Sequence, residues 1–457
     1  MTLVDTGSEV QLPRRRLLAQ RVTSRQWLWG LGVLSLLSFA IRLGSVLGRI
    51  NRKPGGDVWN YFHSATLLVE GKGFINPWIY YGTAGHPQVY SANFAPLFTM
   101  VMAVPQFFGI ESYLAARIWF CLVGTGAVIV VAYAGREIGG RRIGLIAGLL
   151  LAIYPNIWMP TELTMSETLA PLLVGWFLFQ VYRFWREPTT RNVVLLGLSL
   201  GVTILGRDEL ALLAVLVVVP LVLMMKNYSW KQRMRFLLVG LATTTLILAP
   251  WVIRNNLRFQ NLTLISTRIG ITNVATNCDA TYNGSGTGYW SYGCVQSAAI
   301  SPFVDESVAN SHYAHVAYSY ISQHLGELPR VEEARLGRVF GFYNPIQQIQ
   351  LDAGIETRPY NWALTGLGMY YAFVVMSIGG TIALRRRKVT SFPLWAIAAN
   401  VAIATMLTFG DTRYRISFDV SLVLMSAVFL EWALRKTFRW EPEDYVFRRS
   451  PSPAEKA

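Results

Sequence analysis

Residues 27–47 read WLWGLGVLSLLSFAIRLGSVL, and this stretch decides the class of fold. A helix needs about 20 apolar residues to cross the roughly 30 Å hydrocarbon core of a bilayer, at about 1.5 Å per residue. The stretch is long enough. It also lacks the small-residue cleavage site of a signal peptide, so we expect it to remain as the first membrane-spanning helix.

The composition of the 457-residue chain agrees with this reading. Hydrophobic residues make up 53% of the chain and charged residues only 15%, whereas a soluble domain carries roughly 25% charged residues. An ordinary soluble cytosolic enzyme is therefore excluded.

The formal net charge of +15 is organised by topology. Most Lys and Arg residues lie in short clusters at residues 14–25, 136–142, 183–191, 226–235, 385–388 and 435–456. Each cluster borders an apolar run, as the positive-inside rule expects of cytoplasmic loops. We expect no nucleic-acid partner, and both termini should be cytoplasmic.

Apolar runs divide the chain into about ten expected spans, at residues 27–47, 118–135, 143–157, 169–182, 193–206, 210–225, 236–253, 362–384, 392–409 and 416–434. The segment Pro96 to Gly109 is too short to cross, and counting it as a span would place the cluster 136–142 outside. We therefore interpret it as a re-entrant or interfacial helix.

The expected fold is an all-α polytopic membrane protein of about ten to twelve transmembrane helices, with interfacial helices after the first span. Residues 1–26 and 435–457 should be cytoplasmic tails. Residues 27–253 should form an N-terminal transmembrane catalytic module with an outer loop at 48–94, and residues 362–434 the C-terminal transmembrane helices. Residues 254–361 should form an extracytoplasmic soluble module, where Cys278 and Cys294 are predicted to form a disulfide.

Candidate acids follow the first and third apolar runs. Asp57, in PGGDVWNYF, has the chemistry of a base for a substrate hydroxyl, although its spacing alone favours a solvated loop residue. Glu162 and Glu167 follow two prolines in YPNIWMPTELTMSETL. A broken helix at membrane depth indicates a protein-lined or water-filled site, but an acid at a helix start explains Glu167 equally well.

Candidate cations lie at two further outer tips. Arg207, Asp208 and Glu209 lie between two short apolar runs, which indicates a water-filled cavity. A tight turn closed by an ion pair of Arg207 with Asp208 or Glu209 explains them as well, and the two interpretations are compatible. Arg413 and Arg415 precede the last run in FGDTRYRISFD. Their guanidinium groups suit a lipid phosphate, although snorkelling to lipid headgroups is an equal alternative.

These segments, read in order, resemble the GT-C membrane glycosyltransferases, in the branch of the protein O-mannosyltransferases and the lipid A aminoarabinose transferases. The resemblance rests on the order and spacing of GGDVWNYFHSATLLVEGKGF, ANFAPLFTMVMAVPQFFG, GRRIGLIAGLLLAIYP, SETLAPLL, LGRDELALL, PWVIRNNLRF and TRYRISFD. Two departures are Ala95-Pro96 in place of a Pro-Pro pair and the absence of a second acid directly after Asp57. They leave the acceptor class and any metal open.

The resemblance implies transfer of a sugar from a polyprenyl-phosphate carrier to an extracytoplasmic glycan, lipid or protein. It implies that Asp57 acts as base or orients the acceptor, that Glu167 is the acid of the second loop, and that Arg207 and Arg413 lie near the carrier phosphate. Further candidates for substrate binding are Tyr61, His86, Glu162, Asp208, Glu209 and Arg415. No cofactor is certain, and a divalent ion such as Mg²⁺ or Mn²⁺ is left open.

The implied location is the plasma or inner membrane, with the active site on the extracytoplasmic side. Two other functions remain open from sequence. A transporter or lipid flippase would place charged residues near helix centres and repeat one half of the chain in the other. A non-catalytic subunit for glycan assembly would share the fold but tolerate loss of Asp57.

Overall fold

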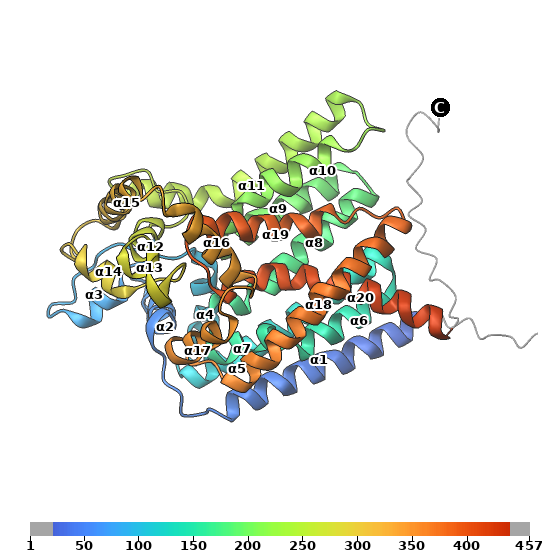
Figure 1. The fold of residues 1–457 in the computed structure, drawn as a ribbon, viewed down its shortest axis with the longest axis horizontal. Helices are drawn as coiled ribbons and strands as arrows, with labels where there is room; N and C mark the ends of the chain where they lie inside the picture. Colours follow the sequence, from blue (N-terminus) through green and yellow to red (C-terminus); the bar gives the residue numbers. More distant parts are fainter. Residues whose placement is uncertain (1–21, 439–457) are drawn as a thin grey trace, which may run out of the picture.

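The computed structural model describes residues 22–438, and these fold into helices (Figure 1). Within this range the only β pairing is an isolated bridge between Ile75 and Tyr90. The predicted all-α fold is confirmed. The basic tails lie mostly at residues 1–21 and 439–457, outside the described range.

Five segments are long and apolar enough to cross a membrane: α1 (Ser24–Leu47), α5 (Tyr113–Gly139), α11 (Trp230–Arg258), α18 (Tyr360–Arg386), and η5 (Thr412–Arg415) with α20 (Ile416–Phe438). A sixth is formed if α6 (Arg141–Ile153) and α7 (Pro155–Leu163) count as one span with a 51° bend. Pro155 lacks a backbone N–H, so the helical ladder is broken at the bend. The chain is therefore an integral membrane protein.

The remaining expected spans are helical but shorter than the roughly 20 residues a crossing needs. They are α8 (Ala170–Arg186), α9 (Thr190–Gly206), α19 (Phe392–Met406), and a run broken into η2 (Asp208–Leu212), η3 (Ala214–Val218) and α10 (Val219–Leu223). Within residues 22–438, five helices, or six with the bent pair, are thus long and apolar enough by themselves to cross a membrane, whereas ten to twelve spans were expected.

The last span forms the centre of the bundle. α20 is buried on most sides and packs against α18, α6, α8 and α5. A Cβ added to Gly380 of α18 would lie 2.0 Å from the carbonyl oxygen of Met425, so only glycine permits this approach. Small residues at such crossings let helix backbones pack closely in a membrane.

The bundle has two distinct ends. At one end, called the inner end, Arg141 donates to the carbonyl of Val22, and both Arg142 and Arg387 pair with Glu431. The N-terminal segment, residues 141–142, residue 387 and the last part of α20 therefore meet at the inner end. At the other end, called the outer end, Arg117 at the start of α5 donates to Val46 at the close of α1.

Residues 48–112 thus leave and rejoin the bundle at its outer end. They contain α2 (Gly56–Val69), α3 (Pro77–Gly82) and α4 (Pro96–Phe107). Because α4 lies between α1 and α5 in the chain, and those helices adjoin at this end, α4 does not cross the bundle. This agrees with the re-entrant or interfacial interpretation of Pro96 to Gly109.

A second group of helices covers the outer end (Figure 1). It comprises α12 (Ile269–Thr276), α13 (Asp279–Tyr282), η4 (Gly284–Gly286), α14 (Tyr292–Ser297), α15 (Glu306–Gln323), α16 (Leu328–Val339) and α17 (Pro345–Ile355). The predicted disulfide between Cys278 and Cys294 is present and joins α13 to α14. Glu306 ties this group to the first outer loop by accepting from the backbone N–H of Ala92.

Candidate active site

Asp57 lies in the first turn of α2, directly after Gly55 and Gly56. Gly56 has φ +53°, a conformation that glycine adopts without strain, and the turn begins the helix there. The Asp57 side chain is 28% exposed, and its carboxylate lies 3.4 Å from Arg268 and 3.7 Å from Arg413. Asp57 is therefore an accessible carboxylate beside two guanidinium groups.

Glu167 lies in η1 (Ser166–Thr168), after the proline-broken helix α7. Its buried carboxylate lies 3.1 Å from Nη1 of Arg207 and 3.9 Å from Nε of Arg413. Burial would raise the pKa of Glu167, but Arg207 and Arg413 outweigh burial and lower it. Glu167 therefore stays charged between two arginines.

The charged residues 207–209, predicted between two apolar runs, lie beside Glu167. Arg207 is the C-cap of α9 in an extended conformation, and its side chain pairs with Glu209 as well as Glu167. Asp208 accepts a hydrogen bond from Ser266 of the 254–361 segment. The local ion pair predicted from sequence is thus present.

Arg413 is the residue that connects the carboxylates. It lies in η5, which Asp411 begins by accepting the Arg413 backbone N–H at 3.0 Å. Besides Asp57 and Glu167, its guanidinium lies 3.2 Å from Glu356. One cation from the last span therefore contacts carboxylates from α2, from η1 and from the α17–α18 connection.

Four of the charged residues around this centre were not predicted from the sequence. Arg268 precedes α12, Glu356 and Arg358 lie between α17 and α18, and Asp411 precedes η5. Arg358 pairs with Glu356 at 2.7 Å and with Asp352 at 3.7 Å. The available signal was the charged run in GIETRPY next to a predicted span, and Asp411 in a motif already quoted.

The arginines of this centre retain unused donors. Nη1 of Arg207 and Nε of Arg413 are buried and donate no hydrogen bond to any residue in the range 22–438. Each of these nitrogens forms an ion pair with the Glu167 carboxylate, but no hydrogen bond to it. Buried N–H groups normally have an acceptor, so this centre has the donors to bind an anionic group.

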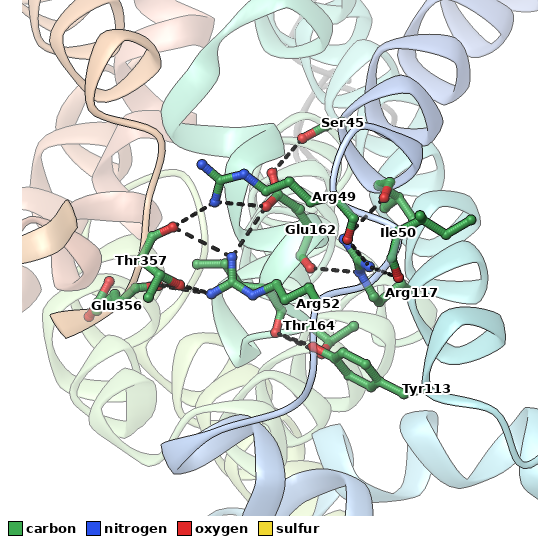
Figure 2. A network of polar contacts seen from close by, with 12 residues as sticks. Ser45, Arg49, Ile50, Arg52, Tyr113, Arg117, Glu162, Thr164, Glu356 and Thr357 are labelled. Atoms are coloured by element: carbon green, nitrogen blue, oxygen red, sulfur yellow. Dashed lines mark hydrogen bonds and ion pairs between the residues drawn. The ribbon is translucent and has the colours of Figure 1, made fainter. Parts of the chain in front are cut away.

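Glu162 belongs to a separate network at the outer end of α1 (Figure 2). Its carboxylate accepts from Ser45 at 2.7 Å and from Arg52 at 3.2 Å, and lies 3.2 Å from Arg49. Arg117 donates to its backbone carbonyl. The Glu162 carboxylate, which was predicted to bind substrate, is instead paired with Ser45, Arg52 and Arg49.

The other predicted site residues lie at different distances from the centre. Tyr61 is buried between Phe94 and Phe98, and burial followed by nearby Asp57 raises its pKa. His86 contacts the carbonyl of Tyr80 on an exposed loop. Arg415 is buried in an ion pair with Asp419 at 3.2 Å and lies over the ring of Tyr370. The structure brings Tyr61 to the centre but not His86 or Arg415.

The residues present do not fit a metal site. Among residues 22–438, no group of three or more His, Cys, Asp or Glu side chains is arranged to hold a metal ion. Guanidinium groups stand beside Asp57 and Glu167 instead.

Comparison with known proteins finds one family model and several solved structures that match this chain. Residues 95–253 match the family described as dolichyl-phosphate-mannose-protein mannosyltransferase. No curated protein matches the chain.

A solved oligosaccharyltransferase from Archaeoglobus fulgidus, in complex with Zn and sulfate, is 17% identical at a TM-score of 0.53, over 89% of this chain and 49% of that one. Its complex with an inhibitory peptide and a dolichol-phosphate is 15% identical at 0.52, over 92% and 53%. The chain thus spans about half the length of that enzyme. ArnT from Cupriavidus metallidurans bound to undecaprenyl phosphate is 14% identical at 0.40, over 91% and 80%.

Proposed function

We propose, from the fold and from the family match over residues 95–253, that this chain belongs to the GT-C superfamily and is a membrane glycosyltransferase. The donor is a sugar linked to a polyprenyl phosphate, and the acceptor is an extracytoplasmic glycan, lipid or protein. The observation that carries the proposal is the pair of buried, unused donors on Arg207 and Arg413 beside the accessible carboxylate of Asp57.

The arginines suit the leaving group. When the bond between the anomeric carbon and the phosphate oxygen breaks, negative charge develops on the phosphate. Preorganised donors in a site with little water stabilise such charge more strongly than water does. Arg413 and Arg207 provide these donors, and Glu167 orients both guanidinium groups from one side.

Asp57 suits the acceptor. In the proposed reaction an acceptor hydroxyl attacks the anomeric carbon and passes its proton to the Asp57 carboxylate. A new carbon–oxygen bond forms as the old one breaks, and the bonding electrons leave with the polyprenyl phosphate. The Arg268 guanidinium lies 3.4 Å from the Asp57 carboxylate.

We propose that the outer end faces the extracytoplasmic side of the plasma or inner membrane. The basic clusters 136–142 and 385–388 meet at the inner end, which the positive-inside rule assigns to the cytoplasm. The disulfide lies at the outer end, and disulfides persist in oxidising compartments. Both termini are then cytoplasmic. The division into residues 27–253, 254–361 and 362–434 follows from the same arrangement.

The test is release of polyprenyl phosphate from labelled polyprenyl-phosphate sugars by membranes that contain the protein. We expect the parent to release it with transfer of the sugar, and Asp57→Asn to lower turnover about 100-fold to 10,000-fold because the base is lost. The variant should fold normally, since Asp57 is part-exposed. Equal turnover by the Asn variant would remove Asp57 from the reaction.

A further inference from the structure

The connection between α17 and α18 contains a strained residue. Thr357 has φ +58°, in the left-handed region that β-branched residues rarely adopt. Such a conformation persists only where surrounding contacts determine it, and it often marks a functional position. This backbone conformation turns the chain at Thr357, so that Thr357 and the neighbouring Glu356 point in different directions.

Two arginines that follow α1 hold this strained residue (Figure 2). Arg49 donates to the carbonyl of Thr357 at 2.8 Å. Arg52 donates to the carbonyl of Glu356 at 3.2 Å and to the hydroxyl of Thr357. Both arginines also contact the buried Glu162, which fixes them in turn.

The held connection directs Glu356 into the candidate active site. The Glu356 side chain is 9% exposed and lies 3.2 Å from Nη1 of Arg413, closer than Asp57 or Glu167 lies to that guanidinium. Glu356 is also the only one of these three carboxylates for which a hydrogen bond to Arg413 is formed within residues 22–438. It therefore sets the orientation in which Nε of Arg413 is left without an acceptor.

We propose that Glu356 is a positioning residue for Arg413, and that Arg49 and Arg52 fix Glu356 by clamping the strained Thr357. Glu356 acts by holding Nη1 of the guanidinium, so that Nε, which forms no hydrogen bond within residues 22–438, can donate to the phosphate of the donor. This inference rests on the proposed function, because it concerns the residue assigned there to the leaving phosphate.

A substitution series separates position from charge. Glu356→Gln keeps a side-chain oxygen that can accept from Arg413 but loses the charge, whereas Glu356→Ala loses both. If Glu356 positions Arg413, Glu356→Ala should bind polyprenyl monophosphate about 10-fold more weakly, and Glu356→Gln should stay within about 3-fold of the parent. If Glu356 acted only as a competing charge, both variants would bind the anion more tightly.

The clamp is tested by a double-substitution cycle. Arg52→Ala should weaken binding in the same direction as Glu356→Ala, and the double variant should be no worse than Glu356→Ala alone, because Arg52 acts through Glu356. Lys53→Ala, an exposed neighbour, and Glu333→Ala, an exposed carboxylate of α16, are the matched controls. The thermal midpoint of each detergent-solubilised variant shows whether the fold is kept.

Binding of polyprenyl monophosphate and sugar transfer are measured on the same samples of the full chain. Unchanged binding by folded Glu356→Ala, equal loss in Glu356→Gln, or additive losses in the double variant would each overturn the inference. A parent that binds polyprenyl monophosphate but transfers no sugar would refute the proposed activity while leaving the binding comparison intact. Failure of the two proposals is therefore distinguishable.

Discussion

Glu162 and Glu167 lie in the same proline-broken segment, are equally buried, and each faces two arginines, yet their surroundings differ in one respect. Around Glu162, Arg49 and Arg52 direct further donors to the carbonyls of Thr357 and Glu356. Around Glu167, Nη1 of Arg207 and Nε of Arg413 are buried and lie near the carboxylate as ion pairs, but they form no hydrogen bond within residues 22–438. The first network is internally satisfied, and the second has capacity for an anion. An arginine–carboxylate cluster thus indicates a binding site only when its hydrogen-bonding groups are incompletely used.

The largest expected difference between the two carboxylates is in turnover. Glu167→Gln should lower turnover by about 100-fold to 1,000-fold, because the two guanidinium groups lose the charge that orients both toward the leaving phosphate. Glu162→Gln keeps a side-chain oxygen that can accept from Arg52, so it should stay within about 2-fold of the parent per folded molecule. Release of polyprenyl phosphate, normalised to folded protein, measures both, and equal losses in the two variants would erase the distinction.

A smaller expected difference is in stability. Glu162→Gln leaves Arg49 and Arg52 without their shared charge, but Arg49 is 39% exposed and solvent compensates it in part. We expect a loss of about 2 kcal/mol in the free energy of unfolding. Thermal unfolding in detergent should show a lower Tm for this variant. A Tm equal to that of the parent would mean that the network in Figure 2 does not stabilise the outer end of α1.

The smallest expected effect is a pH dependence at the border of the second network. Burial, followed by the neighbouring Asp352, raises the pKa of Asp411 to about 6. The folded state therefore binds this proton more tightly than the unfolded state, and the corresponding stability is lost as pH rises from about 4 to above about 6. Asp411→Asn keeps the cap on Arg413 and should flatten this dependence by about 1–2 kcal/mol.

Tm measured against pH for the parent and for Asp411→Asn tests this sign. Parallel curves, or a parent that gains stability relative to the variant between pH 4 and 6, would contradict the shift assigned to Asp411.

Sequence alone predicted the all-α membrane fold because apolar length is a property of contiguous residues, as in α1 and α5. It predicted more spans than there are long helices because runs such as 210–225 are apolar but broken into η2, η3 and α10. Length in sequence does not reveal where a helix breaks.

Part of the candidate site was predicted from the same apolar runs. Asp57, Glu167, Arg207 and Arg413 stand out as charges at the ends of apolar runs. Arg268 and Glu356 do not, because they lie in a polar segment where charge is common, and only the fold brings Arg268 to Asp57 and Glu356 to Arg413. The difference between Glu162 and Glu167 depends on which donors are used, and sequence does not contain that information.

We propose that the buried donors of Arg207 and Arg413 around Glu167 bind the phosphate of the carrier. The decisive measurement is the affinity for polyprenyl monophosphate of the parent, Arg413→Lys, Arg413→Ala and Glu162→Gln. Arg413→Lys keeps the charge but loses the guanidinium fork, so it should bind at least about 10-fold more weakly, Arg413→Ala should bind more weakly still, and folded Glu162→Gln should bind like the parent. Parental affinity in folded Arg413→Ala would remove Arg413 from the phosphate site, and Arg207 would become the better candidate.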